Sequence, residues 1–235
     1  MNTLLKTPLT VSKKIDQPGF MIASDSGYFT QWAKTLFLSI QSRAPWAHVH
    51  FHLFDPTAED LDWASKRDCT VTVETIPAEH LGTDEERIMY LAAARYMRVR
   101  EIYTDDTVLI NQDADSIMVR DLSKDEFLKS LERSWVPTAP KREQLSLCSA
   151  FGVGPDNTRH IICDRYSSVY GTPDWIFAYD QRVMDQMLTA GEISAMDLRY
   201  TDFKFGNSSY IWTGKGNRVY KNQFKQEQAK YLQQI

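Results

Sequence analysis

The chain has 235 residues, of which 43% are hydrophobic and 12% aromatic, enough to bury a sizeable core and too apolar for a disordered protein. A formal net charge of -4 provides no bulk attraction to nucleic acid or to an anionic membrane. The three cysteines, Cys69, Cys148 and Cys163, form no Cys-x-x-Cys pair, which argues against a disulfide framework and against a zinc site.

The N-terminal residues 1–18 are predicted to be a loose lead-in. They carry lysines but no apolar core of the length found in signal peptides. No later run reaches the roughly 18 apolar residues that span a bilayer. We therefore expect a soluble protein in the cytoplasm, a reducing compartment.

The first third of the chain alternates between apolar runs typical of buried strands and segments with apolar residues at helical spacing. In chain order, the predicted elements are a strand at Gly19–Ala23, a helix at Tyr28–Gln41, a strand at Val49–Phe54, a helix at Glu59–Arg67 and a strand at Thr70–Ile76. This alternation predicts an α/β fold with a parallel sheet between helices.

Three histidines, His48, His50 and His52, alternate along the second predicted strand and so share one of its faces. A histidine metal cluster is one interpretation of this pattern. A half-polar strand face under a helix or near the edge of the sheet is the simpler one, and we favour it.

A long helix is predicted next, because Thr83 with Glu86 three residues later matches a capping box. The helix carries two arginines, Arg95 and Arg98. We expect at least one of them to be only a solvated or ion-paired residue on the helix surface.

Two aspartates, Asp113 and Asp115, stand between two short apolar runs that are typical of buried strands. Neighbouring anions withdrawn from water are costly without a cation, and oxygen ligands favour a hard ion such as magnesium or manganese. An acidic turn at a strand end is the alternative. A second triplet, Asp60-Leu61-Asp62, is expected to be only a solvated helix face.

The second half of the chain is less regular. Its predicted elements are a short helix capped by Ser123, a strand fragment at Ser134–Pro137, a bulged strand at Leu145–Val153, a helix at Asn157–Tyr166 and a helix that begins near Asp180 and Gln181. Those two residues either cap the helix or hold a substrate. The aromatic, basic segment beyond Met196 either closes over a phosphate or forms a poorly packed surface strap.

Several short motifs follow one another in order along residues 19–215. They are Ala23-Ser-Asp25-Ser-Gly27-Tyr28, Tyr96-Met-Arg98, Gln112-Asp113-Ala114-Asp115, Ser149-Ala150-Phe-Gly152 and Asp180-Gln181-Arg182. Together they resemble glycosyltransferases of the A-type nucleotide-sugar fold, most of all the retaining family, family eight, that contains glycogenin and the bacterial lipopolysaccharide galactosyltransferases. The resemblance implies one Rossmann-like domain at 19–235 with a mixed, mostly parallel sheet, a nucleotide-binding half at 19–122 and a sugar- and acceptor-binding half with its tail at 123–235.

The resemblance also implies a role for each motif. The implied donor-binding residues are Ala23, Asp25, Tyr28, Arg98, Asp113, Ala114 and Lys215; the implied metal ligands are Asp113 and Asp115; the residues implied to hold the sugar at the reaction centre are Asp180 and Gln181. One departure stands out, because the chain has no histidine after His160 to match the family's third metal ligand. Thr213 or a water is expected to take that place.

The implied activity is the metal-dependent transfer of a sugar from a nucleoside-diphosphate sugar, expected to be a UDP-sugar, to an acceptor hydroxyl with retention. Mn²⁺ or Mg²⁺ is the implied cofactor. Two alternatives stay open, a non-catalytic nucleotide-sugar-binding relative and a phosphatase-like Asp-x-Asp hydrolase. An EF-hand is excluded because Met118 stands where the calcium loop needs glycine. The residues do not indicate which sugar or acceptor is used.

Overall fold

The computed structural model of the protein describes residues 9, 11, 13–76, 83–138, 149–169, 172, 179–214 and 216–235. Lys215 and Cys148 lie outside this part of the chain, and so does the first part of the strand predicted at Leu145–Val153. The elements are β1 (Gly19–Asp25), α1 (Ser26–Tyr28), α2 (Lys34–Arg43), β2 (His48–Phe54), α3 (Ala58–Ser65), β3 (Thr70–Glu74), α4 (Asp84–Met97), α5 (Val99–Ile102), β4 (Leu109–Gln112), β5 (Ser116–Met118), α6 (Lys124–Ser130), β6 (Trp135–Pro137), β7 (Ala150–Val153), α7 (Thr158–Val169), α8 (Tyr179–Thr189), β8 (Ser194–Met196), β9 (Ile211–Thr213) and α9 (Asn222–Leu232).

Seven of the described strands form one mixed sheet in the order β3-β2-β1-β4-β7-β6-β8. Strands β3, β2, β1 and β4 run parallel to one another. Strand β7 runs antiparallel to both β4 and β6, and β8 runs parallel to β6. The predicted α/β class with a mixed sheet is therefore confirmed. A separate pair of strands, β5 and β9, is antiparallel.

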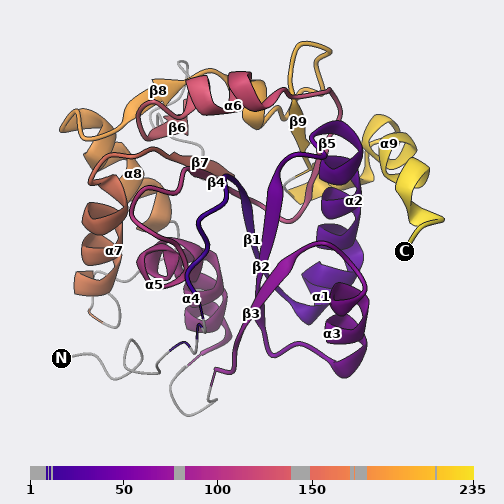
Figure 1. Cartoon of the computed structure of the whole chain (residues 1–235), viewed down its shortest axis with the longest axis horizontal. Coiled ribbons are helices and arrows are strands. Elements are labelled where there is room, and N and C mark those ends of the chain that lie inside the picture. Colours follow the sequence, from indigo (N-terminus) through magenta and orange to yellow (C-terminus); the bar gives the residue numbers. More distant parts are fainter. Residues whose placement is uncertain are drawn as a thin grey trace.

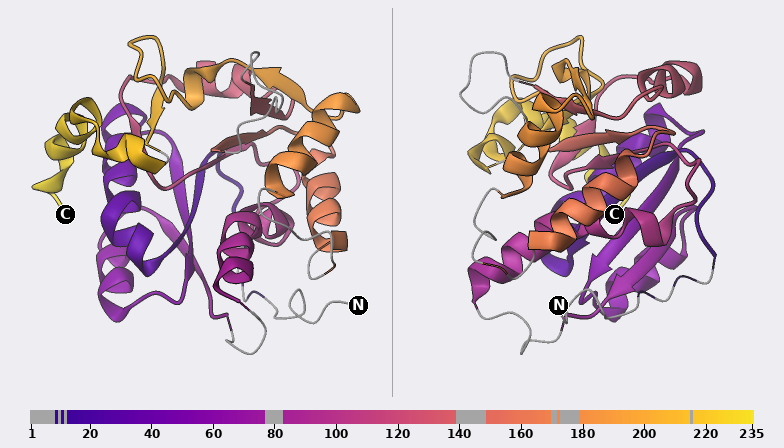
Figure 2. Two further views of the ribbon diagram at one scale, coloured as in Figure 1. Left: turned by 180° about the vertical axis from the view of Figure 1, so that it is seen from behind. Right: turned by 90° about the vertical axis from the view of Figure 1, so that its left-hand side faces the viewer.

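Helices cover both faces of the sheet. Figure 1 shows α1, α2 and α3 on one face and α4, α5, α7 and α8 on the other, and the reverse view in Figure 2 agrees. In β1, Phe20 and Ile22 belong to the core under α2 and α3, whereas Met21 belongs to the core under α4. Burial on both faces explains why β1 reads as a continuous apolar run.

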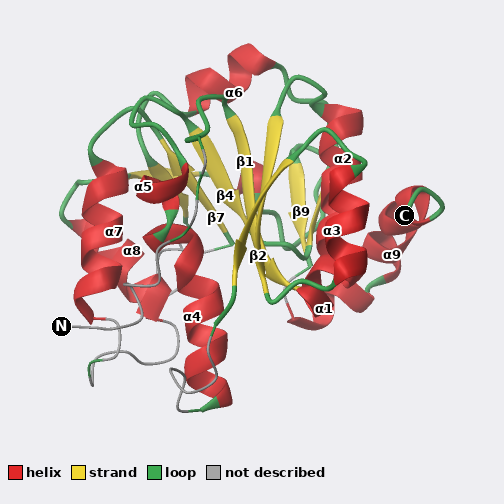
Figure 3. Ribbon diagram, turned by 60° about the horizontal axis from the view of Figure 1, so that its bottom comes forward, coloured by secondary structure: helices red, strands yellow, loops and turns green. Residues whose placement is uncertain are grey.

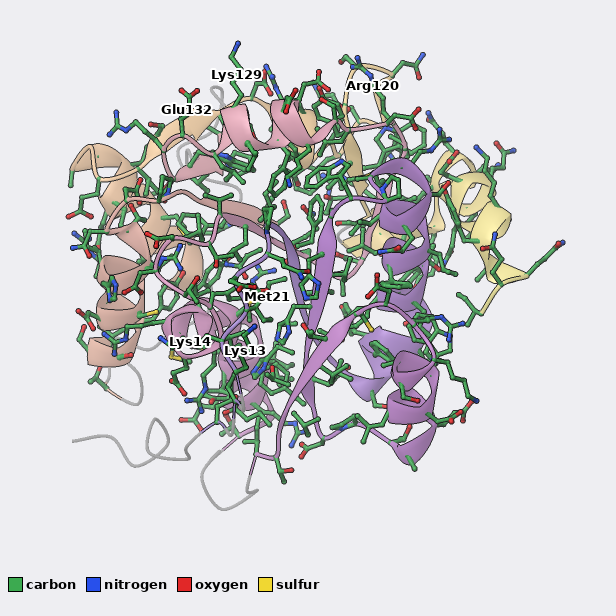
Figure 4. All side chains as sticks on the ribbon, viewed as in Figure 1. Lys13, Lys14, Met21, Arg120, Lys129 and Glu132 are labelled. Carbon is green, nitrogen blue, oxygen red and sulfur yellow. The ribbon has the colours of Figure 1, made fainter. Side chains whose placement is uncertain are left out.

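The middle of the sheet is withdrawn from water. Figure 4 shows Met21 near the centre, whereas Arg120, Lys129 and Glu132 lie along the outer rim. Met21 is fully buried and pairs in register with His50 on β2 and Asn111 on β4. The polar side chains of His50 and Asn111 are fully buried as well.

The first strand is two residues longer than predicted. Ser24 and Asp25 pair with Leu53 and Phe54 of β2 and so continue the strand, although both are common turn residues. Sheet pairing outweighs their local preference. The following helix starts with α1, passes through a π-helical segment at Phe29–Ala33, a form often found near functional sites, and continues as α2.

The C-terminal segment is an integral part of the fold. Strand β9 pairs with β5. Helix α9 contacts α2, and in Figure 3 it lies on the outer side of α2 and α3. Five residues of the segment pack with Trp32 and Ile117 in a third core cluster; they are Phe205, Trp212, Val219, Phe224 and Tyr231. The expectation of a poorly packed surface strap is therefore wrong for the described part of this segment.

No helix in the described part of the chain combines the length and the apolar character that a membrane crossing requires.

Candidate functional site

The candidate site lies where β1 and β4 end. The two strands are parallel neighbours, with Ile22 opposite Gln112, so their carboxyl ends reach the same edge of the sheet. Strands β2 and β3 extend from β1 in one direction, whereas β4 lies on its other side. In open α/β sheets, ligands bind at the carboxyl ends of the strands where the strand order changes direction in this way.

Asp25 and Tyr28 occupy the β1 side of this edge. Asp25 caps α1 by accepting a hydrogen bond at Oδ1 from the backbone N–H of Tyr28, at 2.8 Å. The side chain of Tyr28 follows on the first turn, and the residue is 51% exposed. A planar ring presented in this way suits stacking against a flat ligand.

Asp60 fixes the segment that follows β1, which corrects the expectation of a solvated helix face. It is 2% exposed and accepts hydrogen bonds from Ser26 Oγ and from Thr30 Oγ1, and the ammonium of Lys34 lies 3.7 Å away. Burial alone would raise the pKa of Asp60, but the hydrogen bonds from Ser26, Thr57 and Thr30 lower it.

The sequence contained a signal for this role. Thr57 and Asp60 form a capping box at the start of α3, in which Asp60 turns back toward the N-cap. Asp62, two residues later, is exposed and pairs with Lys66, as expected for a helix face. The two aspartates of this triplet therefore have different environments.

Asp113 and Asp115 occupy the β4 side of the edge. A guanidinium nitrogen of Arg95, Nη1, forms a short ion pair with Oδ1 of Asp113. The side chain of Asp113 is 17% exposed and that of Arg95 is 6% exposed, and Asp115 as a whole is 8% exposed. Both carboxylates thus lie at the sheet edge but are largely withdrawn from water.

A closed ring of hydrogen bonds lies under this aspartate turn. Gln112 Nε2 donates to Ser116 Oγ at 3.0 Å and to the carbonyl oxygen of Ser149 at 3.1 Å. Ser116 Oγ lies 3.1 Å from Thr213 Oγ1, which lies 3.0 Å from Thr201 Oγ1. The Thr201 hydroxyl is bonded in turn to the hydroxyl of Ser149 and completes the ring. All five residues are buried, so the ring is shielded from competing water.

The backbone adds two more ties to the turn. The N–H of Asp113 donates to the carbonyl of Ser149 at 2.8 Å, and the N–H of Gly214 donates to the carbonyl of Asp115 at 2.7 Å. A Cβ at Gly214 would lie 2.4 Å from Cγ1 of Val219, so only glycine allows this close approach. The turn is therefore held from both sides.

Arg98 has a different environment from Arg95. It is 1% exposed, and its guanidinium donates to Glu74 Oε1 at 2.8 Å and to Glu101 Oε1 at 2.9 Å. The arginine that contacts the aspartate turn is Arg95, which the motif comparison did not select. A donor contact for Arg98 remains a prediction.

The other predicted site residues are only partly described. Asp180 and Gln181 stand in the first turn of α8, where a helix was predicted, and Gln181 is half-buried. The side chain of Asp180 lies outside the described part of the chain, as does Lys215. Their roles therefore remain predictions.

The donor set at the aspartate turn suits a hard divalent cation. Within the described ranges, no group of three acidic, histidine or cysteine side chains is arranged to hold a metal ion. The Thr213 hydroxyl is fully buried and engaged in the ring, which favours water over Thr213 as the further ligand. Magnesium and manganese are commonly held by one or two carboxylates with water and phosphate oxygens, so the pair fits such an ion.

The chain matches no family model, and no curated protein matches it in sequence. Among solved structures it is similar to the crystal structure of the galactosyltransferase LgtC in complex with donor and acceptor sugar analogs. The TM-score is 0.61 at 12% identity, and the match covers 90% of this chain and 95% of that chain. The predicted fold, an A-type nucleotide-sugar fold, is thereby confirmed.

Proposed function

We propose that this chain is a glycosyltransferase that moves a sugar from a UDP-sugar to an acceptor hydroxyl, with Mn²⁺ or Mg²⁺ and with retention at the anomeric carbon. The proposal rests on the turn that carries Asp113 and Asp115. Buried hydrogen bonds hold this turn, and it lies where the strand order of the sheet changes direction. The fold of the chain is similar to that of a galactosyltransferase. Retention rests on the family resemblance alone.

The chemistry suits the charges at this edge. Transfer breaks the bond between the anomeric carbon and the phosphate, and negative charge accumulates on the departing diphosphate. A cation held by Asp113 and Asp115 would neutralise that charge. Arg95 adds a fixed positive charge beside Asp113, and Lys215 is the proposed phosphate contact.

The donor's remaining contacts follow from the other motifs. Tyr28 is proposed to stack on the uracil base, and Asp25 to accept a hydrogen bond from the nucleoside. Asp180 and Gln181 are proposed to orient the sugar. Three further residues carry over from the resemblance as donor contacts: Ala23, Arg98 and Ala114.

A non-catalytic nucleotide-sugar binder is the second candidate. It is favoured by the environment of Thr213, whose hydroxyl is engaged with Ser116 and Thr201 at the position where the family has a metal-ligating histidine. A site with fewer protein ligands holds its cation less tightly. Binding of UDP-sugars without any turnover would identify this case.

A screen of UDP-sugars for manganese-dependent hydrolysis and binding tests the proposal. Asp113→Asn and Asp115→Asn are each expected to reduce turnover by about a hundredfold or more, because the cation that would neutralise the leaving diphosphate loses a carboxylate ligand. The melting temperature of Asp115→Asn should change little, whereas Asp113→Asn also removes the ion partner of Arg95 and should melt at a lower temperature while still folding.

Asp62→Asn is the matched control, because Asp62 belongs to the other Asp-x-Asp triplet and is exposed. Its turnover should equal that of the unmodified protein. Full activity in both turn variants would refute the assignment of the site.

A further inference from the structure

Histidines on β2 and threonines on β3 alternate in a row between the two strands. In the parallel register of the two strands, His50 is opposite Thr70 and His52 is opposite Thr72. Each threonine hydroxyl bridges two successive imidazoles. The ladder comprises His48, Thr70, His50, Thr72, His52 and Glu74, and we refer to it as the His–Thr ladder.

The ladder is continuous. Thr70 Oγ1 lies 2.9 Å from His48 Nε2 and 2.8 Å from His50 Nδ1. Thr72 Oγ1 lies 2.9 Å from His50 Nε2 and 2.7 Å from His52 Nδ1, and His52 Nε2 lies 3.0 Å from Glu74 Oε2. Both ring nitrogens of His50 and His52 are thus engaged, and the described residues offer no metal-binding group of three. The interpretation as a half-polar strand face is confirmed, and the metal cluster is not found there.

The hydrogen bonds of the ladder all run in one direction, because each group has a fixed number of hydrogens to donate. A hydroxyl has one hydrogen, a neutral imidazole has one N–H, and a carboxylate only accepts. A neutral His52 therefore donates to Glu74 from Nε2 and accepts at Nδ1 from the Thr72 hydroxyl. The Thr72 oxygen must in turn accept from Nε2 of His50. The same step repeats at Thr70, so all three histidines are Nε2–H tautomers.

The charges around Glu74 support this direction. Burial would raise the pKa of Glu74, but the hydrogen bonds from His52 and Arg98 outweigh it and lower the pKa to about 2. Tyr90 also donates to this carboxylate, and Glu101 faces the far side of Arg98. Glu74 is thus ionised at neutral pH and accepts from every partner.

The neutral state of His50 has a related cause. Burial lowers the pKa of His50 well below its ordinary value, and the neighbouring histidines lower it further. The ring of Tyr103 packs edge-on against His50. At the outer end, burial lowers the pKa of His48, and the charges of Asp68 and Asp16 oppose that shift.

Glu74 also holds α4 at two points, Tyr90 within the helix and Arg98, the residue that caps its C-terminal end. The Tyr90 hydroxyl donates to Oε1, and Arg98 donates to the same carboxylate through Nη2 at 2.8 Å and Nε at 3.1 Å. Tyr90 and Arg98 are eight residues apart, which is about two helical turns. Arg95 lies between them along the chain, and its guanidinium is placed on Asp113.

We propose that Glu74 is a positioning residue for the Arg95–Asp113 pair, and that the His–Thr ladder keeps its carboxylate oriented toward α4. The carboxylate receives a fixed donor from His52 on the sheet side and donors from Tyr90 and Arg98 on the helix side. Rotation of the carboxylate would break at least one of these bonds. This anchoring fixes how α4 is rotated against the sheet. It thereby fixes the position of Arg95. The consequence for turnover rests on the proposed function.

The ladder itself is tested by ¹⁵N NMR of the histidine rings in the unmodified protein, Thr72→Val and Thr72→Ser. The unmodified protein should show Nε2–H tautomers at His50 and His52. Thr72→Val removes the hydroxyl and keeps the shape, so His50 loses the acceptor for its Nε2–H and should change to Nδ1–H. His52 should keep Nε2–H because Glu74 still accepts from it.

Thr72→Ser retains the hydroxyl and should behave like the unmodified protein. An Nδ1–H tautomer at His50 or His52 in the unmodified protein would overturn the ladder's direction. An unchanged His50 in Thr72→Val would do the same.

The positioning role is tested through the Nε–H signal of Arg95, which is assigned by its loss in Arg95→Lys. Glu74→Gln should shift this signal, whereas Glu101→Gln, which removes the more exposed carboxylate on Arg98, should not. Tyr90→Phe removes one of the two attachments of α4 with little change of shape. It should shift the signal in the same direction, and it serves where Glu74→Gln does not fold. An Arg95 signal that stays in place in these variants would overturn the positioning role.

UDP-sugar hydrolysis separates this inference from the proposed function. Tyr90→Phe is expected to lower kcat about tenfold with less effect on KM, and Glu101→Gln to change neither. A protein without turnover would refute the proposed function, while the two NMR measurements would still decide the ladder and the position of Arg95. Unchanged kcat together with a shifted Arg95 signal would overturn the link to turnover.

Discussion

Asp60 and Asp113 each begin an Asp-x-Asp triplet, yet their partners give them different roles. Asp113 lies at the sheet edge against Arg95, whereas Asp60 is enclosed by hydroxyls and Lys34 and ties α3 to the segment after β1. A carboxylate in a polar, enclosed setting contributes to stability, and one at a crevice can contribute to binding. The short motif alone does not distinguish them.

Asp60 and Asp62 give a direct test of this difference. Asp60→Asn is expected to lower the free energy of unfolding by about 1–3 kcal/mol, because buried hydrogen bonds to a charged group are lost. Asp62→Asn should stay within about 0.5 kcal/mol, since exposed ion pairs contribute little. Urea denaturation measures both. Equal effects in the two variants would contradict the described environment of Asp60.

Arg98 is expected to matter more for stability than for binding. Arg98→Met leaves the buried carboxylate of Glu74 without its ion partner and should lower the free energy of unfolding by about 3–5 kcal/mol. Arg95→Met should cost less, because Asp113 is more accessible to water. Chemical denaturation of both variants tests this order, and the reverse order would contradict it.

At the scale of the elements, the aspartate turn is held by segments that are distant in sequence. Gln112 and Ser116 flank the turn. Ser149 approaches it from the position just before β7, Thr201 from the segment before β9, and Thr213 from β9 itself. A closed ring of buried polar groups restrains every member, because opening any bond leaves an unsatisfied group. The turn is thus presented in one conformation.

Helix α9 is likewise part of the core. Phe224 is fully buried against Trp32 of the segment before α2 and against Phe205. Phe224→Ala should therefore lower the free energy of unfolding by about 3–5 kcal/mol. Lys225→Ala, at the exposed neighbouring position, should have little effect. A small effect at Phe224 in thermal or urea unfolding would show that α9 is only loosely attached.

At the scale of the whole molecule, one sheet separates two apolar cores, and the candidate site lies at its edge between them. The core under α2 and α3 supports the β1 side of the site, and the core under α4 supports the β4 side through Arg95. The His–Thr ladder lies on the α4 side of the sheet. Its titratable groups, His50 and Glu74 among them, therefore belong to this half of the molecule.

The stability of the whole protein is expected to fall in acid. His50 has a folded-state pKa well below its ordinary 6.5, so the unfolded chain binds its proton first and stability is lost as the pH falls below about 6.5. Glu74 has a folded-state pKa of about 2 against an ordinary 4.5, so a second loss follows below 4.5. Both signs agree.

Calorimetry between about pH 8 and pH 4 measures this profile, since His residues titrate in that range. The melting temperature should be nearly constant at the upper end and should decline below about pH 6.5. His50→Gln cannot be protonated, so its melting temperature should decline less over the first part of the range. A melting temperature that rises on acidification from neutral pH would contradict the buried, neutral state of His50.

Local patterns in the sequence were sufficient for much of the fold. Apolar runs predicted β1, β2 and β4, and capping residues such as Thr83 and Ser123 marked the starts of α4 and α6. These features depend on neighbours within one turn or one strand, so they can be predicted from short stretches of chain. The aspartate turn between β4 and β5 was predicted on the same grounds.

Contacts between distant segments decided the rest. The strands β8 and β9 and the helix α9 were not predicted, because short or weakly patterned elements form only against partners far along the chain. The sequence placed the histidines on one face, but the register of β3 selected their threonine and glutamate partners. The choice of Arg95 over Arg98 at the turn depended on the rotation of α4, which tertiary packing sets and local periodicity does not.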